Sequence, residues 1–271
     1  MRINDSSSSI SILSQLRENN KKLSKTFEQL ASGKRVNSAK DDPAALALAS
    51  SLESSLRGIE TANQGISYSQ GALNTAAGGL SSTLDSLQRA RELAVQSANG
   101  TLSDSDRNNL QTEYDQVLEN IDSVASQTSF GGTSLLDGSF SSDVLTGADG
   151  QTQNISVESA SAASLGVSTS GIATQSAAED AIESIDSAIA SVNSQLASIG
   201  ASQNALEFSS NANDVAKENL AAAQSNAVDA DFGQLASQLS QQKIQQAAQL
   251  AVLKAEQETK KSFYKSLLAK A

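Results

Sequence analysis

An apolar repeat of seven residues, sustained for about seven heptads, is the feature that most constrains this chain. Residues seven apart return to the same side of a coiled-coil helix, so the repeat predicts a long helix packed along other helices. Of 271 residues only 1 is proline, Pro43, and Asp42 before it can cap a helix start. We therefore expect one helix from Pro43 to Ala98. Its repeat positions are Leu52, Ile59, Ile66, Leu73, Leu80, Leu87 and Ala94, with a companion series at Leu56, Asn63, Gln70, Ala77, Leu84, Arg91 and Ala98.

Four further segments carry apolar residues at alternating steps of three and four, which also indicates helices. One lies at the N-terminus, with its repeat at Leu13, Leu16, Asn20, Leu23, Phe27 and Leu30. One begins at the capping-box pattern Ser103–Asp106 and should fold back on the long helix, because Asn99-Gly100 makes the connection short. The other two are expected from Ser176 to about Ala227 and from Gly233 to Leu268.

The segment from about Phe130 to Gly171 has a different character. It contains the turn signals Gly131-Gly132 and Asp137-Gly138, and Gln153–Glu158 alternates as a strand does. We predict a small β-hairpin region here. The expected fold is therefore mainly α: a long antiparallel helical rod or coiled-coil bundle, a β-hairpin region in the middle of the chain, and paired N- and C-terminal helices.

The residue types that are absent exclude several kinds of chemistry. The chain has 0 Cys and 0 His, which excludes disulfides, thiol nucleophiles, a Ser-His-Asp triad and an HExxH zinc site. Gly33-Lys34 lacks the earlier glycine of a phosphate loop, and Asp41-Asp42 beside Pro43 favours a helix cap over acid–base catalysis. We expect no enzyme activity, no cofactor and no metal site, although carboxylates leave calcium or magnesium open in principle.

Charge is distributed unevenly along the sequence. The net charge is +5 over residues 1–40, −20 over residues 41–242 and +4 over residues 243–271. Basic ends can bind nucleic acid or anionic lipid. However, Lys21 and Lys25 share a helix with the apolar Leu23, which favours the solvated side of a coiled-coil helix. We therefore expect no nucleic-acid binding. We also expect no membrane insertion, since no run approaches the roughly 20 apolar residues of a membrane span.

The start of the sequence lacks the apolar run of a usual cleaved signal peptide. This predicts a cytoplasmic protein or one exported by a route that does not cleave a signal.

Several stretches resemble the bacterial flagellin family. The most characteristic is Gln88–Gly100, with the letters QRARELAVQSANG. The resemblance continues through four other stretches: Leu30–Asp42, Ile121–Gly132, Ser194–Leu206 and Ala227–Phe232. It covers nearly the whole chain, and the interval between Phe130 and Ser176 is too short for the large outer domains that many flagellins insert.

The resemblance implies a secreted structural subunit that polymerises into the extracellular flagellar filament for swimming motility. It would be exported unfolded by the flagellar type III apparatus, and its partners would be many copies of itself, an export chaperone, hook-associated proteins and the filament cap. The family pattern divides the chain into inner-core helices at 1–42 and 229–271 and a helical rod domain at 43–175, which includes the hairpin region, and at 176–228.

The resemblance also implies site residues. A patch recognised by a host Toll-like receptor, and used in subunit packing, would contain Arg89, Leu93 and Glu113. Packing of the inner-core helices would use Leu13, Leu16, Leu23, Phe27, Leu30, Leu250 and Leu253. Export-chaperone contacts would be Leu239, Ile244, Leu250 and Leu253.

Two alternatives remain open. The opening Met1-Arg-Ile also resembles the hook–filament junction protein, a related structural subunit. The chain could instead be a secreted coiled-coil binding protein. The sequence ends Leu267-Leu268-Ala-Lys-Ala271, where family members often end soon after Leu-Leu, so the innermost contact is expected to differ in detail.

Overall fold

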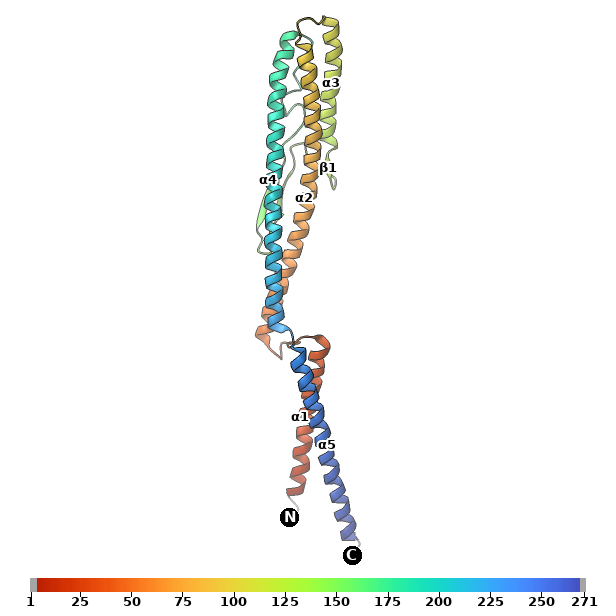
Figure 1. Cartoon of the computed structure of the whole chain (residues 1–271). Coiled ribbons are helices and arrows are strands. Elements are labelled where there is room, and N and C mark those ends of the chain that lie inside the picture. Colours follow the sequence, from red (N-terminus) through yellow and green to blue (C-terminus); the bar gives the residue numbers. More distant parts are fainter. Residues whose placement is uncertain (1–3, 269–271) are drawn as a thin grey trace. The chain divides into compact units, whose positions relative to one another are not determined.

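The structure is a computed structural model that describes residues 4–268. Long helices dominate these residues, with two short hairpins between the third and fourth (Figure 1). The elements in chain order are α1 (Asn4–Ser32), α2 (Pro43–Ser97), α3 (Asp104–Gln127), β1 (Ser129–Phe130), β2 (Thr133–Ser134), β3 (Ser141–Leu145), β4 (Thr152–Ser156), α4 (Gln175–Val228) and α5 (Phe232–Leu268). This confirms the predicted fold class.

The chain forms two compact units. The first contains residues up to Ser54 together with those from Asn219 onward, and the second contains residues Ser55 to Glu218. Helices α2 and α4 contribute to both.

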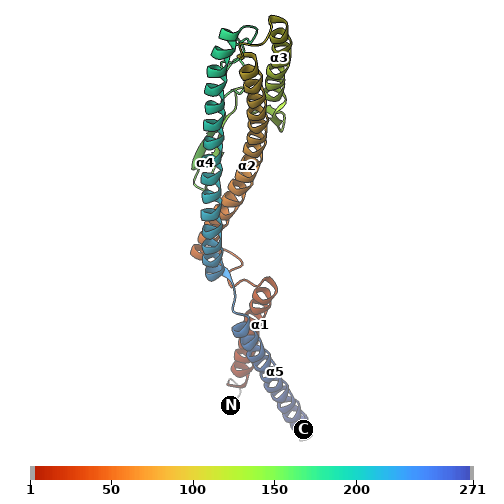
Figure 2. The same cartoon turned by 45° about the horizontal axis from the view of Figure 1, so that its top comes forward.

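In the second unit, α2, α3 and α4 lie side by side (Figures 1 and 2). Helices α3 and α4 both run opposite to α2 (Figure 1), and ion pairs join each of them to α2. Arg89 of α2 pairs with Glu113 of α3, and Arg91 of α2 pairs with Asp186 of α4. Further along the same pair of helices, Glu60 meets Lys217 at 2.8 Å. The unit is thus an antiparallel helical bundle.

Two helix starts follow the local chemistry of the sequence. The Asp42 carboxylate accepts hydrogen bonds from the backbone N–H groups of Ala44 and Ala45 at 3.1 and 2.9 Å, which satisfies donors that the first turn of α2 leaves unpaired. At α3, Ser103 and Asp106 form the complete reciprocal capping box. Both helices begin where the sequence predicted.

The core of the second unit corrects one part of the predicted repeat. The main series is buried as expected from Ile59 to Ala94. The companion series is only partly buried, with Ala77, Leu84 and Ala98 packed against the core. The fully buried partners lie three residues after each main position, not four. These partners are small or carry a hydroxyl group: Ala62, Ser69, Ala76, Thr83, Ala90 and Ser97. Small side chains let the helices approach closely, and Ser69 and Thr83 satisfy their hydroxyls on backbone carbonyls four residues earlier.

The hairpins pack against this bundle. Strands β1 and β2 join through Gly131 and Gly132, which have φ values of 60° and 85° that favour glycine. Strands β3 and β4 pair antiparallel from Ser141↔Ser156 to Leu145↔Thr152. The buried amide of Asn213 on α4 donates to the Thr146 carbonyl at the end of β3 and to Asn63 on α2, both at 2.9 Å. This bond network holds the second hairpin to both long helices.

The first unit contains α1 paired antiparallel with α5, the ends of α2 and α4, and the segment between α1 and α2. Gly33, at φ 70°, ends α1 and its carbonyl accepts from Ala230 N–H at 3.0 Å. Arg35 donates through its backbone N–H to Val228 O and through its guanidinium to Ala227 O, both at 2.7 Å. Val36, Ala49 and Val228 form a small buried cluster. Hydrogen bonds to backbone carbonyls therefore join the segment between α1 and α2 to the end of α4 and the residues after it.

Candidate functional site

Polar and apolar side chains are about equally common where α1 and α5 meet. Residues turned toward the partner follow steps of three and four on both helices, and many carry amide or hydroxyl groups. On α1 they are Ile12, Leu16, Asn19, Leu23, Thr26 and Leu30; on α5 they are Leu235, Leu239, Gln242, Gln246, Gln249, Leu253, Glu256 and Lys260. We call this set the terminal seam.

Few hydrogen bonds join the two sides of the terminal seam in the described residues. Asn19 donates to the Gln242 carbonyl at 2.9 Å, and Gln246 donates to Asn20 at 2.8 Å. Four buried side-chain oxygens have no partner among these residues: those of Asn19, Gln242, Gln249 and one of Glu256. A buried acceptor without a partner is destabilising, so this seam holds the pair weakly.

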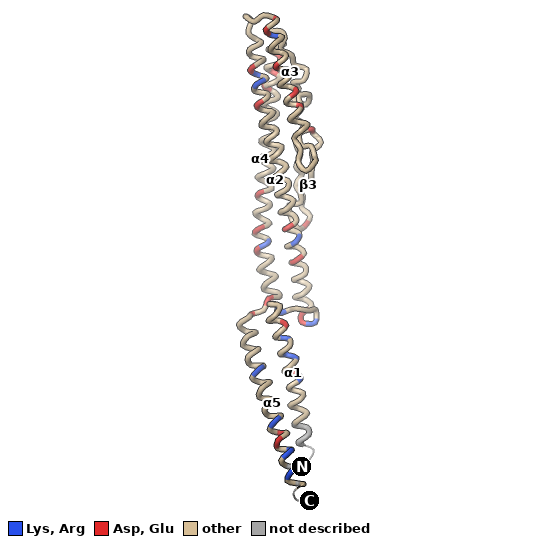
Figure 3. Tube along the Cα trace, turned by 90° about the vertical axis from the view of Figure 1, so that its right-hand side faces the viewer, with Lys and Arg blue, Asp and Glu red and all other residues tan. Residues whose placement is uncertain are grey.

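A charged cluster lies toward the ends of α1 and α5. Lys260 Nζ lies 3.0 Å from Glu256 and 2.7 Å from the Ser9 hydroxyl, and Ser9 also donates to Glu256. The Ser9 hydrogen bond, with Lys260, lowers the pKa of Glu256. Glu256 is thus held ionised beside the lysine. Figure 3 shows how lysine and arginine positions recur along α1 and α5.

The predicted inner-core residues divide into two groups. Leu16, Leu23, Leu30 and Leu253 are half-buried in the terminal seam. Leu13, Phe27 and Leu250 are exposed, with 40%, 44% and 41% of their surface accessible, and the Phe27 ring lies 5.6 Å from Lys243 Nζ of α5. Asn19 and Thr26 face the seam, whereas the predicted repeat had Asn20 and Phe27. As in α2, the observed step is three residues where four were predicted.

The predicted chaperone contacts divide in the same way. Leu239 and Leu253 are half-buried against α1, while Ile244 and Leu250 are exposed. An outward apolar surface and a seam-facing one therefore coexist on α5.

The patch predicted on α2 and α3 needs one correction. Arg89 and Glu113 do meet on the surface, with Arg89 Nε 3.2 Å from Glu113 Oε1, and Arg89 also pairs with Glu92 at 2.9 Å. Glu113 and then Glu92 raise the pKa of Arg89. Leu93, however, is 1% exposed and packs in the core of the bundle, because it points from α2 toward the other helices. Only Arg89 and Glu113 of the predicted set reach the surface.

The described residues contain no group of three or more acidic, histidine or cysteine side chains placed to hold a metal ion. Among the helices of this part of the chain, none is both long enough and apolar enough to cross a bilayer.

Comparison with known proteins gives consistent matches. The profile of the bacterial flagellin N-terminal helical region matches residues 3–141, and that of the C-terminal helical region matches residues 182–263. A phase 1 flagellin of Salmonella naestved is 41% identical over 170 residues, which cover 61% of this chain and 33% of the relative. The match thus spans about a third of the length of the curated relatives.

Two solved structures are also similar. The crystal structure of Bacillus cereus flagellin is 30% identical, with a TM-score of 0.50, over 55% of this chain and 88% of that one. A putative flagellar hook-associated protein from Vibrio parahaemolyticus is 19% identical, with a TM-score of 0.59, over 70% of this chain and 100% of that one, which shows a shared fold alone. Since the two flagellin profiles together match most of the sequence, the chain belongs to the bacterial flagellin family.

Proposed function

We propose that this chain is a structural subunit that polymerises into the bacterial flagellar filament and so serves swimming motility. The observation that carries the proposal is the combination of family membership with a terminal helix pair that leaves apolar side chains in water. Ile10, Leu13 and Phe27 on α1 are 66%, 40% and 44% exposed, and Ile244 and Val252 on α5 are 70% and 54% exposed. Burial of these side chains between neighbouring copies would supply a driving force for assembly.

The unpaired buried oxygens of the terminal seam support the same proposal. A pair with several unpaired buried oxygens gains little from folding alone, so neighbouring copies would have to complete it. Segments 1–42 and 229–271 would then form the inner core of the filament, and segments 43–175 and 176–228 the surrounding helical rod domain. Contacts between different surfaces of successive copies generate an open helical polymer.

Seeded elongation tests this function directly. Purified monomer is mixed with filament fragments of the same protein and examined by negative-stain electron microscopy. The proposal expects fragments to lengthen in proportion to monomer consumed. Intact, folded monomer that never elongates the seeds would contradict it.

The runner-up is a hook–filament junction protein, present in few copies. The same assay separates the two functions, because a junction protein would bind fragment ends without extending them. The similarity to the hook-associated protein extends to the fold alone, whereas the sequence profiles are those of flagellin.

Location and the other partners follow from the proposed function. The protein would be exported unfolded by the flagellar type III apparatus to the extracellular filament, and it would meet hook-associated proteins and the filament cap there. Before export, a chaperone would hold Leu239, Ile244, Leu250 and Leu253 on α5. Exposed Ile244 and Leu250 are available to such a groove directly, whereas Leu239 and Leu253 become available only when α5 separates from α1.

The exposed pair Arg89 and Glu113 would serve subunit packing and, in a host, recognition by a Toll-like receptor. Its side chains keep 50% and 45% of their surface, so a partner can reach them. Replacement of Arg89 by alanine would weaken a receptor reporter response without unfolding the protein. A response unchanged by this variant would remove Arg89 from the proposed patch.

A further inference from the structure

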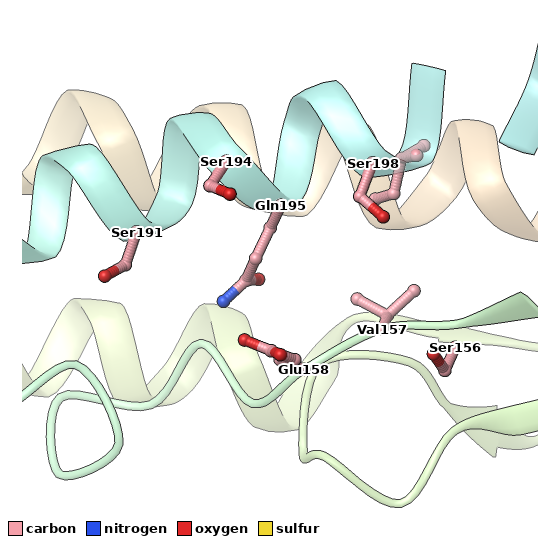
Figure 4. A pocket seen from close by; sticks show the side chains of 8 residues that line it. Ser156, Val157, Glu158, Ser191, Ser194, Gln195 and Ser198 are labelled. Carbon is pink, nitrogen blue, oxygen red and sulfur yellow. The ribbon is translucent and has the colours of Figure 1, made fainter. Parts of the chain in front are cut away.

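A serine-lined cavity in the second unit belongs to its solvated surface. It measures about 280 Å³ and lies between α4 and the segment that follows β4 (Figure 4). Figure 4 shows the amide nitrogen of Gln195 turned toward Glu158, whose side chain is exposed. The side-chain oxygen of Gln195 is closed to solvent, so it cannot receive a ligand from the opening.

The connection between α2 and α3 carries a more reactive arrangement. It contains the one Asn-Gly step of the sequence, Asn99-Gly100, and both residues are exposed. The Asn99 side-chain oxygen accepts hydrogen bonds from the Thr101 backbone N–H at 3.1 Å and from the Thr101 hydroxyl at 3.0 Å. This is an Asx turn, in which a side-chain oxygen bonds to the backbone two residues further along. The Asn99 amide is therefore held close to the peptide that follows it.

Arg107, in the first turn of α3, fixes the backbone of this turn. Arg107 is 5% exposed, and its Nη2 donates to the Asn99 carbonyl at 3.0 Å. The Leu102 N–H donates to the same carbonyl at 3.2 Å. The other terminal nitrogen of Arg107, Nη1, is buried and has no partner in the described residues. The turn is thus held in one conformation, and the buried guanidinium depends on its carbonyls.

This geometry brings a nucleophile and an electrophile together. The ring closed by the Thr101 N–H bond to the Asn99 oxygen contains both the Asn99 Cγ and the Gly100 nitrogen. The Gly100 N–H makes no backbone hydrogen bond among the described residues, and glycine has no β-carbon to obstruct its nitrogen. Attack of this nitrogen on Cγ would place negative charge on the Asn99 oxygen. The two Thr101 donors already point at that oxygen, as donors in an oxyanion hole do.

We propose that Asn99 is a site of spontaneous deamidation that the folded α2–α3 connection promotes. The Gly100 nitrogen loses its proton to a base in the solvent and forms a bond to Asn99 Cγ. The bond from Cγ to the side-chain nitrogen breaks, and this nitrogen takes up a proton and leaves as ammonia. Water then opens the cyclic succinimide at either carbonyl, which yields aspartate or isoaspartate. Each conversion consumes one water molecule and releases one ammonia.

The isoaspartate product would alter the contacts of Arg107. In isoaspartate the main chain runs through the side-chain carbonyl carbon, so the Asn99 carbonyl that Arg107 holds is displaced. Because Nη1 of Arg107 already lacks a partner, the buried guanidinium would keep fewer acceptors. A buried charged donor without acceptors is destabilising. Deamidation should therefore weaken the start of α3.

Mass spectrometry of the full-length protein tests the site. Trypsin releases the peptide Glu92–Arg107, in which Asn99 is the only asparagine, and deamidation raises its mass by exchanging an amino group for a hydroxyl group. After incubation at mildly alkaline pH, this peptide should gain that mass before Asn154 does, an exposed asparagine that isoleucine follows. The reaction at Asn99 should also be faster in the folded protein than in urea, because the Asx turn exists only in the folded chain.

Two variants separate the turn geometry from the sequence step. Gly100→Ala should slow the reaction by roughly tenfold or more, because the methyl group crowds the attacking nitrogen. Alanine fits here, since a β-carbon would lie 3.5 Å from Gln175 Oε1, an ordinary contact. Thr101→Val keeps the backbone donor, removes the hydroxyl and should slow the reaction by roughly threefold, because a hydrogen bond open to water contributes less than one in a closed site. Thr112→Val, at an exposed threonine of α3, is the matched control and should react at the wild-type rate.

Three results would overturn the proposal. They are loss of the Asn99 amide no faster than that of Asn154, faster reaction in urea than in the folded protein, and equal rates for Thr101→Val and Thr112→Val. Circular dichroism establishes that each variant is folded. As a second readout, wild type that has lost the Asn99 amide should unfold at a lower urea concentration than fresh protein, whereas Gly100→Ala incubated for the same time should not. An equal decrease in both would show that the product does not disturb Arg107.

Discussion

Gly79 on α2 lies against Thr128 so closely that a β-carbon at position 79 would stand 2.7 Å from the threonine Oγ1. The same atom would stand 2.7 Å from Leu136 Cδ1. The neighbouring Gly78 faces open space, with nothing within 4 Å of a β-carbon built there. Of these two adjacent glycines in one helix, only Gly79 is required for packing.

The two glycines predict opposite effects of the same substitution. Gly79→Ala should destabilise the protein by about 1–3 kcal/mol, because the new methyl group overpacks the contact between α2 and the end of α3. Gly78→Ala should stabilise it by about 0.5–1 kcal/mol through helix propensity. Urea unfolding of both variants measures the difference. Equal free energies of unfolding for the two variants would show that position 79 is not close-packed.

The core repeat shows how far a sequence pattern could predict this bundle. The aliphatic series from Ile59 to Ala94 could be recognised because large apolar side chains mark it. The companion positions could not, because Ala62, Ser69 and Thr83 look like solvent-facing residues. They are buried because close helix packing favours small side chains, and their hydroxyls bond to their own helix.

Ser97 predicts a larger effect than a surface serine would. It is fully buried, and its hydroxyl donates to the Ile172 carbonyl at 2.5 Å, which joins the end of α2 to the segment before α4. Ser97→Ala should cost about 1–3 kcal/mol because it leaves that carbonyl without a donor. Ser82→Ala, at an exposed position of the same helix, should change the stability by less than about 0.5 kcal/mol. Thermal unfolding of both variants compares them, and a similar small effect of each would contradict the prediction.

The ion pair between Arg91 and Asp186 predicts a dependence on pH and salt. Arg91 Nε lies 2.6 Å from Asp186, and this contact lowers the pKa of Asp186 below 3.8. The stabilisation is therefore present above about pH 4 and is lost as the pH falls through the lowered value. Asp186→Asn should reduce the urea midpoint at neutral pH and flatten its decrease toward acid. High salt should shrink the difference, because both side chains are half exposed. A difference that grows with salt would exclude an electrostatic origin.

The candidate site was predicted less well than the fold, for a physical reason. Family resemblance pointed to Arg89, Leu93 and Glu113 together. Leu93 is turned from Arg89 by about 40° around the helix, and this small offset places it in the core. In the terminal seam, Asn19 and Thr26 on α1 and three glutamines on α5 stand at positions where a seam usually has apolar residues. A strict heptad count along Leu235, Gln242 and Gln249 could have found it if polar residues had been allowed at seam positions.

Tyr114 predicts a change in stability at high pH. It is fully buried in the bundle, and burial raises the pKa of its phenol to about 12. An unfolded tyrosine ionises near 10, so the native state resists ionisation that the unfolded state undergoes. The contribution of this phenol to the free energy of unfolding is fully present below about pH 10 and is lost as the pH rises toward 12. The urea midpoint of the wild type should be lower at pH 11 than at pH 9. The same difference should be smaller for Tyr114→Phe. Equal decreases in both proteins would place the pH dependence elsewhere.

The outward side chains of α5 predict a separation between folding and assembly. Ile244 and Leu250 are 70% and 41% exposed, so serine at either position should leave the unfolding of the monomer nearly unchanged. The proposed filament buries these residues, so the same variants should slow or abolish seeded elongation. Gln245→Ala, at an exposed polar position of the same helix, serves as the matched control and should elongate normally. If Ile244→Ser and Leu250→Ser elongate as fast as Gln245→Ala, these two side chains are not contacts between copies.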